Sequence, residues 1–252
     1  MSGQKIAGSV ALVTGANRGI GKAIVDELLA RGASKVYAGA RRTETLDQMV
    51  REHPGRVIPL ELDVTNDEQV SSLTTRAPDV TIVVNNAGIA QAPIGAAISD
   101  RGIFEAARAE IDVNYLGPLR VIQALAPVLA KNGGGALVNI ASVVALTSFP
   151  ALGSYSASKA AVRSLTQTAR VHLAGQGTQV VGVYPGPVDT DMAAEIPLQK
   201  VSPASVAAKI LDAVETATPE VYPDPFSEDF GVRFESSPSG LEAHVAANAT
   251  AV

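Results

Sequence analysis

The chain has 252 residues, of which 46% are hydrophobic and 18% charged, and its formal net charge is −5. This length suits one doubly wound α/β domain with a large core, and no apolar run reaches the roughly 18 residues that suggest a membrane span. The acidic balance argues against general nucleic-acid binding, the absence of cysteine excludes disulfides and thiolate metal sites, and the 3 isolated histidines form no metal-binding cluster.

Apolar, β-branched runs alternate with helical patterns along the chain, and this alternation favours a parallel sheet covered on both faces. We expect one domain over residues 1–252, because no internal repeat or linker is evident. Strands are predicted near residues 9–14, 35–40, 56–61, 80–85, 136–141, 179–184 and 220–222. Helices are predicted near residues 19–31, 43–51, 66–75, 100–131, 154–174 and 203–216.

A glycine-rich turn joins the first strand to the first helix. Gly15 permits a tight turn, Gly19 lets the backbone approach a pyrophosphate, and Gly21 lets the helix pack close to the sheet. The spacing G-x-x-x-G-x-G, between a strand and a helix, predicts a dinucleotide phosphate site at the helix N-terminus. The turn reads Thr14-Gly15-Ala16-Asn17-Arg18-Gly19-Ile20-Gly21.

The end of the second strand bears on cofactor choice. An acidic residue about 20 positions past the glycines binds a ribose 2′-hydroxyl, whereas an arginine accommodates a 2′-phosphate. Arg41 occupies that position, Arg42 follows it, and the next carboxylate is Glu44. With Arg18 able to approach the same phosphate, we predict NADPH over NADH. The alternative is that Arg41 and Arg42 form a solvated basic turn.

Two features are predicted in the middle of the chain. Thr65 with Glu68 has the pattern of a capping box at the start of the third helix. Asn114 lies in the long helical pattern 100–131, four residues before Pro118, which is expected to kink the helix. An asparagine at a kink can simply satisfy freed backbone groups.

A hydroxyl, a phenol and an ammonium follow in Ser142, Tyr155 and Lys159. Ser142 comes directly after a predicted strand, while Tyr155 and Lys159 share one face of the helix 154–174. A cation beside a phenol favours the phenolate, so Lys159 and the charge of an oxidised nicotinamide are expected to lower the pKa of Tyr155. Ser142 would then hold a substrate oxygen, and Tyr155 would exchange a proton with it. A solvated Tyr–Lys pair is the structural alternative.

Together with Asn85-Asn86-Ala87-Gly88 and Pro185-Gly186 with Thr190, these motifs resemble those of the short-chain dehydrogenase/reductase family, in the same order. The resemblance covers about Gly8 to Thr216 and fades after Val221. It implies a Rossmann-type seven-stranded parallel sheet of order 3-2-1-4-5-6-7 with helices on both faces. It also implies hydride transfer with a nicotinamide and a catalytic tetrad in which Asn114 holds a water that relays protons to Lys159.

The same resemblance implies the cofactor contacts. Asp63 would meet the adenine amino group, Val64 would pack against the ring, and Val188 with Thr190 would hold the carboxamide. For Asp63 the alternative is a helix cap, and for the asparagines it is a tie between strands. The predicted cofactor-binding set is Gly15, Asn17, Arg18, Gly19, Ile20, Gly21, Arg41, Arg42, Asp63, Val64, Asn86, Ala87, Gly88, Tyr155, Lys159, Pro185, Gly186, Val188 and Thr190.

The segment 191–201 after Thr190 is short, which predicts an open and mainly apolar substrate pocket. The tail 226–252 follows two prolines, and we expect it to cover the pocket or a neighbouring subunit, or to be partly disordered. Candidate pocket residues, which could equally be core residues, are Val143, Ala145, Leu146, Phe149, Leu152, Met192 and Ile196.

The combined prediction is an NADPH-dependent carbonyl reductase, or alcohol dehydrogenase in reverse, acting on small-molecule ketones or aldehydes. A 3-oxoacyl-thioester reductase is the nearby alternative, for which Arg101, Arg108 and Lys200 are the candidate docking residues. A non-catalytic NADP(H) sensor is the alternative from another class.

The remaining expectations concern partners and location. The N-terminus lacks the apolar stretch of a secretory signal, so we expect a cytoplasmic protein. No nucleic-acid, membrane or metal partner is expected. By the resemblance, a homo-oligomer is predicted, a dimer or tetramer built on the helices 100–131 and 154–174.

Overall fold

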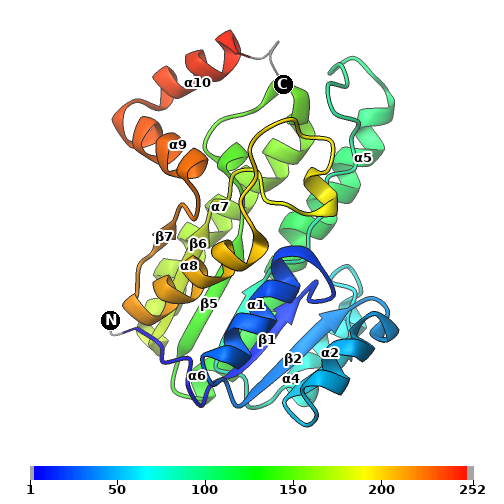
Figure 1. Cartoon of the computed structure of the whole chain (residues 1–252), viewed down its shortest axis with the longest axis vertical. Coiled ribbons are helices and arrows are strands. Elements are labelled where there is room, and N and C mark those ends of the chain that lie inside the picture. The colour runs from blue at the N-terminus through cyan, green and yellow to red at the C-terminus, as the bar shows by residue number, and fades with distance from the viewer. Residues whose placement is uncertain (1–2, 249–252) are drawn as a thin grey trace.

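Seven parallel strands form the sheet of this computed structural model, which describes residues 3–248 (Figure 1). The strand order β3-β2-β1-β4-β5-β6-β7 confirms the predicted doubly wound α/β topology. Because all adjacent pairs are parallel, the carboxyl ends of the strands share one edge, where α/β proteins place their ligands. The strands are β1 (Val10–Thr14), β2 (Lys35–Ala40), β3 (Val57–Glu61), β4 (Ile82–Asn85), β5 (Gly135–Ile140), β6 (Thr178–Val183) and β7 (Glu220–Val221).

Helices and helical turns connect the strands. The α-helices are α1 (Gly19–Ala30), α2 (Asp47–Glu52), α3 (Asp67–Ser71), α4 (Leu73–Arg76), α5 (Gly102–Ile111), α6 (Gly117–Lys131), α7 (Gly153–Leu173), α8 (Pro203–Thr216), α9 (Pro225–Ser236) and α10 (Pro238–Ala247). Shorter turns are η1 (Thr43–Leu46), the π-helical η2 (Asp112–Leu116), η3 (Val143–Ala145), η4 (Pro150–Leu152), η5 (Ala174–Gln176) and η6 (Asp191–Ala193). No helix within the described residues is both long and apolar enough to cross a bilayer.

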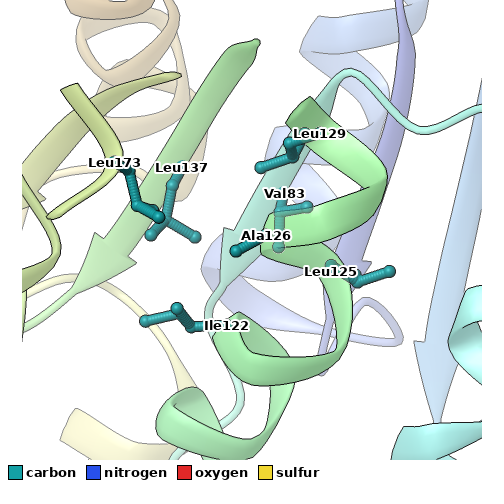
Figure 2. Close-up of a pocket in the computed structure, with 7 residues that line it drawn as sticks. All are labelled: Val83, Ile122, Leu125, Ala126, Leu129, Leu137 and Leu173. Atoms are coloured by element: carbon teal, nitrogen blue, oxygen red, sulfur yellow. The ribbon is translucent and has the colours of Figure 1, made fainter. Parts of the chain in front are cut away.

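The core has two layers because successive strand residues point to opposite faces of the sheet. In β1, Ala11 and Val13 pack into one cluster and Leu12 into the other. α1 and α8 lie side by side over the first face (Figure 1). On the second face, Leu125 and Leu129 of α6 lie near β4 and β5 (Figure 2). The space in Figure 2 is lined only by apolar side chains, so it is part of the packing between α6 and the sheet.

The predicted helix 100–131 is three segments, because a π-helical turn separates α5 from α6. The Gly117 N–H bonds to the Asp112 carbonyl five residues earlier. Pro118, at the start of α6, has no N–H to donate to the Asn114 carbonyl four residues before it. The widened turn therefore falls where the regular α-helical bond is impossible, and it contains Asn114.

The predicted capping box of Thr65 and Glu68 is wrong, because the helix begins one residue later. Asn66 is the N-cap of α3, and its side chain accepts a hydrogen bond from the Gln69 N–H at 3.0 Å. The Thr65 hydroxyl instead donates to Asp63 Oδ1 at 2.7 Å. The Thr65 hydroxyl, which the sequence pattern predicted to cap the helix, is thus bonded to Asp63 instead.

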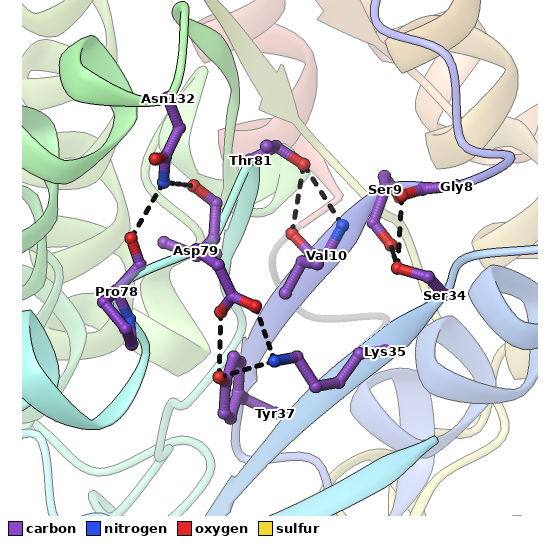
Figure 3. A network of polar contacts seen from close by, with 11 residues as sticks. Gly8, Ser9, Val10, Ser34, Lys35, Tyr37, Pro78, Asp79, Thr81 and Asn132 are labelled. Atoms are coloured by element: carbon purple, nitrogen blue, oxygen red, sulfur yellow. Dashed lines mark hydrogen bonds and ion pairs between the residues drawn. The ribbon is translucent and has the colours of Figure 1, made fainter. Parts of the chain in front are cut away.

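A polar network ties together the sheet edge opposite the strand carboxyl ends (Figure 3). Lys35, at the start of β2, bonds to Asp79 and to the Tyr37 hydroxyl, and Tyr37 donates to Asp79 at 2.8 Å. Asn132, after α6, donates to the carbonyls of Pro78 and Val80. These contacts fix the segment before β4 at the edge away from the predicted active site.

The C-terminal tail contains two helices, α9 and α10, at the same end of the molecule as α5 (Figure 1). The sequence left this segment without a predicted element. α9 starts with a capping box in which Asp224 accepts from the Ser227 N–H and Ser227 bonds back to the Asp224 backbone. Residues 249–252 of the predicted tail lie outside the described residues.

Candidate active site

Tyr155 and Lys159 occupy the first turns of α7, beside the carboxyl end of β5. Lys159 is buried, at 4% exposure, and its Nζ donates a hydrogen bond to the Ile140 carbonyl at 2.8 Å. The same Nζ lies 5.7 Å from the centroid of the Tyr155 ring. The Tyr–Lys pair is therefore fixed against the sheet, which excludes the solvated pair considered from the sequence.

Asn114 is buried in the π-helical turn and bonds to two different elements. Its Oδ1 accepts from the Ile89 N–H at 2.8 Å, and its Nδ2 donates to the Ile89 carbonyl at 2.8 Å and to Ser158 Oγ at 2.9 Å. These three bonds use both N–H donors and one lone pair of the side-chain amide. The Asn114 carbonyl, by contrast, lacks its α-helical donor because residue 118 is proline.

Gly88 brings Asn114 and Lys159 together. A β-carbon built at this glycine would lie 3.2 Å from Asn114 Oδ1 and 3.4 Å from Lys159 Nζ. A side chain here would crowd Asn114 Oδ1 and contact Lys159 Nζ, so glycine allows the loop after β4 to pass close beside both groups.

Ser142 follows β5 and caps η3. Its Oγ bonds to the Pro185 carbonyl at 3.3 Å and accepts from the Val144 N–H at 3.4 Å. Both distances are at the long end for hydrogen bonds, so the hydroxyl can reorient toward a substrate oxygen at little cost.

Burial sets the acid–base properties of the pair. Loss of solvation lowers the pKa of Lys159 to about 8. Burial also raises the pKa of Tyr155 above its ordinary value, and the negative charge of Glu110 raises it further. In the protein alone, burial dominates the Tyr155 phenol, and the lowering expected from Lys159 with an oxidised nicotinamide stays a prediction.

The glycine turn after β1 has the features of a phosphate cradle. Gly15 and Gly19 have φ angles of +64° and +54°, which disfavour side chains, and α1 begins directly at Gly19. No side chain caps this helix at Arg18, so its first N–H groups point out of the helix without a cap. An anion at this N-terminus would satisfy them, which fits the predicted dinucleotide pyrophosphate.

Asn86 holds the shape of this turn. Its Nδ2 donates to the carbonyls of Thr14 and Gly15 at 3.0 Å each. A β-carbon at Gly21 would lie 2.2 Å from the Gly15 carbonyl oxygen, so this glycine is needed for the turn itself. Asn85, at the end of β4, donates to Asn139 of β5 at 2.9 Å, so this side chain ties two neighbouring strands together.

Basic side chains gather near the adjoining ends of β1 and β2. Thr14 pairs with Gly39 in the sheet, and the Ala16 N–H donates to the Gly39 carbonyl. Arg41 and Arg42 follow β2 and are exposed. Arg18 is also exposed and pairs with Asp191 at 2.8 Å, across to the loop after β6. Asn17 and Ile20 are half-buried in the turn between them.

The remaining predicted cofactor residues lie on neighbouring loops. Asp63 Oδ1 accepts from the Thr65 N–H at 2.9 Å as well as from its hydroxyl, which favours the local structural role for that oxygen. Val64 is buried beside Gly117. Thr190 approaches the glycine turn, since a β-carbon at Gly19 would lie 3.1 Å from its Cγ2.

Comparison with known proteins decides the family. The sequence model of the short chain dehydrogenase family matches residues 9–200. The chain belongs to this family. It is an oxidoreductase, and the resemblance stated from its motifs is confirmed.

Individual relatives agree with this assignment. The chain is 35% identical to the 3-oxoacyl-(acyl-carrier-protein) reductase FabG of Thermotoga maritima over 200 residues, covering 77% of this chain and 79% of that one. A short chain dehydrogenase from Burkholderia cenocepacia, solved in complex with NADP, is 39% identical, with a TM-score of 0.88 and coverage of 96% and 98%. A short-chain dehydrogenase from Streptomyces avermitilis is 28% identical, with a TM-score of 0.82 and 96% coverage of both chains.

In this short-chain dehydrogenase the predicted pocket residues divide into two groups. Val143, Phe149 and Leu152 belong to one apolar cluster with the tail helices, and the Phe149 and Phe230 rings stack at 5.6 Å between centroids. Ala145 and Leu146 are buried in the same cluster. Met192 is exposed and Ile196 half-buried, and both lie outside this cluster.

Two buried carboxylates next to the dehydrogenase site escaped the sequence analysis. Asp224 accepts from the Gly186 N–H at 2.8 Å and so links α9 to the loop after β6. Glu110 is fully buried on α5, one helical turn before Asn114. The sequence signal for Asp224 was the Asp-Pro pair that starts α9. The signal for Glu110 was its spacing of four residues from Asn114. Neither carboxylate belongs to a metal cluster, since no group of three or more potential ligands occurs among the described residues.

Proposed function

We propose that this enzyme is an NADPH-dependent carbonyl reductase, reversible as an alcohol dehydrogenase, that acts on ketones or aldehydes. The observation that carries the proposal is the buried Lys159 ammonium. Its Nζ donates to the Ile140 carbonyl and lies 5.7 Å from the centroid of the Tyr155 ring. Such an arrangement suits proton transfer to a carbonyl oxygen. Its position at the carboxyl end of β5 is where a ligand of an open α/β sheet binds.

The roles follow from the geometry of each side chain. Ser142, whose hydroxyl is only weakly held, orients the substrate carbonyl. Tyr155 donates its proton to the same oxygen, and Lys159 stabilises the phenolate that results. The bound nicotinamide supplies the hydride to the carbonyl carbon.

Proton resupply is assigned to Asn114 and Lys159. The Asn114 carbonyl lacks its α-helical donor, so it can accept a hydrogen bond from a water. With a pKa lowered to about 8, Lys159 can release and regain a proton near neutral pH. A water on the Asn114 carbonyl would connect Lys159 to solvent.

Several residues support NADP(H) as the cofactor. The uncapped start of α1 and the turn at Gly15 and Gly19 suit the pyrophosphate. Arg41 and Arg42, exposed after β2, supply positive charge for a 2′-phosphate, with no carboxylate before Glu44. The similar Burkholderia cenocepacia protein was solved with NADP, which supports the same choice here.

Replacing Tyr155 by Phe tests the mechanism, because it removes the hydroxyl and keeps the ring. We expect turnover to fall by roughly 10²–10⁴-fold, as for other losses of acid–base catalysis, with NADPH affinity largely unchanged. Steady-state rates and NADPH fluorescence titration measure the two quantities. Full activity in Tyr155→Phe would reject Tyr155 as the acid.

A 3-oxoacyl-thioester reductase is the second candidate, favoured by the name of the Thermotoga maritima relative. Arg101 and Arg108 are exposed on or beside α5, whereas Lys200 is half-buried and bonds to the Ala194 carbonyl. Rates of NADPH oxidation with ketones, aldehydes and 3-oxoacyl thioesters separate the candidates. A preference for thioesters would select the second, and no turnover on any of them would favour a non-catalytic sensor.

A further inference from the structure

Three phenylalanine rings stack in a row between α9 and the loop that joins η3 to η4. The Phe230 ring stacks on Phe149 at 5.6 Å and on Phe226 at 4.6 Å between ring centroids. Phe230 is buried, whereas the two outer rings are half-buried. α9 belongs to the tail, which lies beyond the residues 9–200 that the family model matches. The row therefore joins a part of the chain outside the family pattern to a loop of the candidate site.

One end of the row touches the segment that carries the predicted acid. Phe149 lies between Ser142 and Tyr155 in the sequence, and its backbone N–H donates to Ser156 Oγ at 3.2 Å. Ser156 is the neighbour of Tyr155 in the first turn of α7. Tyr155 packs against the same apolar cluster as Phe149. A shift of Phe149 therefore acts directly on the start of α7.

The other end of the row touches the loop after β6. A β-carbon built at Gly186 would lie 2.9 Å from Cδ1 of Phe226, so Phe226 packs against this glycine. The carbonyl of Pro185 accepts from the Val143 N–H at 3.0 Å and from the Ser142 hydroxyl at 3.3 Å. In the proposed function this loop borders the nicotinamide. Phe226 thus lies on the side of the site that receives the hydride donor.

The row ties the two loops together by contacts that the reaction does not use. In the proposed function the Ser142 hydroxyl turns to the substrate and gives up its bond to the Pro185 carbonyl. The stacked rings take no part in that exchange, and aromatic pairs prefer defined offset arrangements. Phe230 is the ring that the other two share, so the separation of the loops depends on it.

We propose that Phe230 is a positioning residue that sets the distance between the substrate carbonyl and the nicotinamide. The inference rests on the proposed function, in which Ser142 and Tyr155 hold the carbonyl and the loop at Gly186 borders the hydride donor. Hydride transfer requires the reacting atoms to approach closely, and a misplacement of about 1 Å can cost on the order of 100-fold in rate. A row of rings that fixes both loops therefore governs the rate of this step.

Phe234 provides a matched control on the same helix. It lies four residues after Phe230, on the same face of α9, and is half-buried. The Arg163 guanidinium of α7 lies over its ring, 4.7 Å from the centroid. Phe234→Leu therefore removes a ring from the tail and leaves the stacked row intact.

Phe230→Leu is the test, because it keeps an apolar side chain and removes the ring. Enzyme loaded with NADPH is mixed with a saturating concentration of the ketone or aldehyde that turns over fastest in the comparison above. The loss of NADPH absorbance is followed in a single turnover, whose rate constant reports hydride transfer and whose amplitude reports the fraction of competent enzyme. A slower decay with NADPH deuterated at the transferred hydrogen verifies that this step is observed.

We expect the rate constant to fall about tenfold in Phe230→Leu, with an amplitude close to that of the wild type. Phe226→Leu removes the ring that packs on Gly186 and should slow the same step. Phe234→Leu should keep the wild-type rate constant. A merely structural role of Phe230 gives the opposite pattern, a lower amplitude with an unchanged rate constant.

Each result decides for or against the inference. Unchanged rate constants in Phe230→Leu and Phe226→Leu, with Tyr155→Phe inactive, overturn it and leave the proposed function standing. An equal slowing in Phe234→Leu also overturns it, because the effect would then come from the tail as a whole. If circular dichroism shows that Phe230→Leu does not fold, Phe226→Leu decides alone. Full activity in Tyr155→Phe rejects the proposed function first.

Discussion

Lys159 shows how a single side chain can be costly for folding and useful for chemistry. A lysine buried to 4% exposure, with one carbonyl partner, is poorly solvated in its charged form. The resulting pKa of about 8 allows it to exchange protons near neutral pH. Glu110 is a second buried side chain of this kind, and its Oε1 accepts hydrogen bonds from the Gln91 and Ala92 N–H groups. Burial is the first cause of the raised pKa of Tyr155, and the charge of Glu110 adds to it.

At the same scale, Arg41 is predicted to set the preference for NADPH over NADH. We expect Arg41→Ala to weaken NADPH binding roughly tenfold to a hundredfold, because each charge-assisted hydrogen bond to the 2′-phosphate contributes about 1.5–3 kcal/mol. NADH has no such phosphate, so its affinity should change little. Fluorescence titration of both nucleotides measures the difference.

Arg51→Ala is the matched control for this prediction. Arg51 is an exposed arginine near the end of α2, outside the predicted cofactor site. It should leave both affinities unchanged. Equal NADPH affinity in Arg41→Ala and the wild type would reject the phosphate contact and favour a solvated basic turn.

At the scale of elements, the strands and the glycine turn were predictable from sequence because their signals are local. Buried parallel strands are continuous apolar runs, and Gly15 and Gly19 adopt positive φ angles that other residues avoid. The start of α3 was mispredicted because Thr65 has two possible partners, and Asp63 engages it before the helix begins. Local competition of this kind is settled by geometry that the sequence pattern does not contain.

The site was less predictable where contacts are distant in sequence. Glu110 has the appearance of a solvated helix residue, and its burial depends on the loop after Gly88 folding over it. The tail helices were missed because the segment is polar and rich in serine. Their N-terminal signals were nevertheless present, since Asp224-Pro225 and Ser237-Pro238 each place a cap before a first-turn proline.

Asp224 connects the tail to the predicted nicotinamide loop, so its removal should affect both. Asp224→Ala leaves the N–H groups of Gly186 and Ser227 without their acceptor, and we expect a loss of about 2–4 kcal/mol in the free energy of unfolding. Because the loop at Gly186 loses its tie, the KM for NADPH should rise as well. Urea denaturation and steady-state kinetics measure these effects.

Ser237→Ala is the control for the capping contribution alone. Ser237 caps α10 from an exposed position, so its replacement should cost about 1 kcal/mol and leave the KM for NADPH unchanged. A KM for NADPH that is unaltered in Asp224→Ala would show that the bond to Gly186 does not position the loop.

At the scale of the whole molecule, the amino-terminal and carboxyl ends of the strands carry different kinds of contact. One edge is tied together by the Lys35, Tyr37 and Asp79 network (Figure 3). The other carries the loops after β1, β4, β5 and β6, which bring together residues distant in sequence. Stability and chemistry are thereby placed at opposite ends of the strands, so loops at the site can vary without loosening the sheet.

Assembly is the prediction that belongs to this scale. The family resemblance predicts a dimer or tetramer built on the helices of residues 100–131 and 154–174. Both regions expose a large apolar side chain, Phe104 at 64% on α5 and Val171 at 75% on α7. We therefore expect light scattering to give a mass two or four times the 25.8 kDa of one chain.

Charge placed in this surface should break the assembly, because an aspartate buried in an apolar interface is costly to desolvate. The double variant Phe104→Asp with Val171→Asp is expected to elute as a monomer with an unchanged circular dichroism spectrum. Val232→Asp makes the same kind of change at a residue 68% exposed on α9, outside the predicted interface, and should keep the wild-type mass. A wild-type mass of one chain would refute the predicted oligomer, and an intact assembly in the double variant would move the interface to another face.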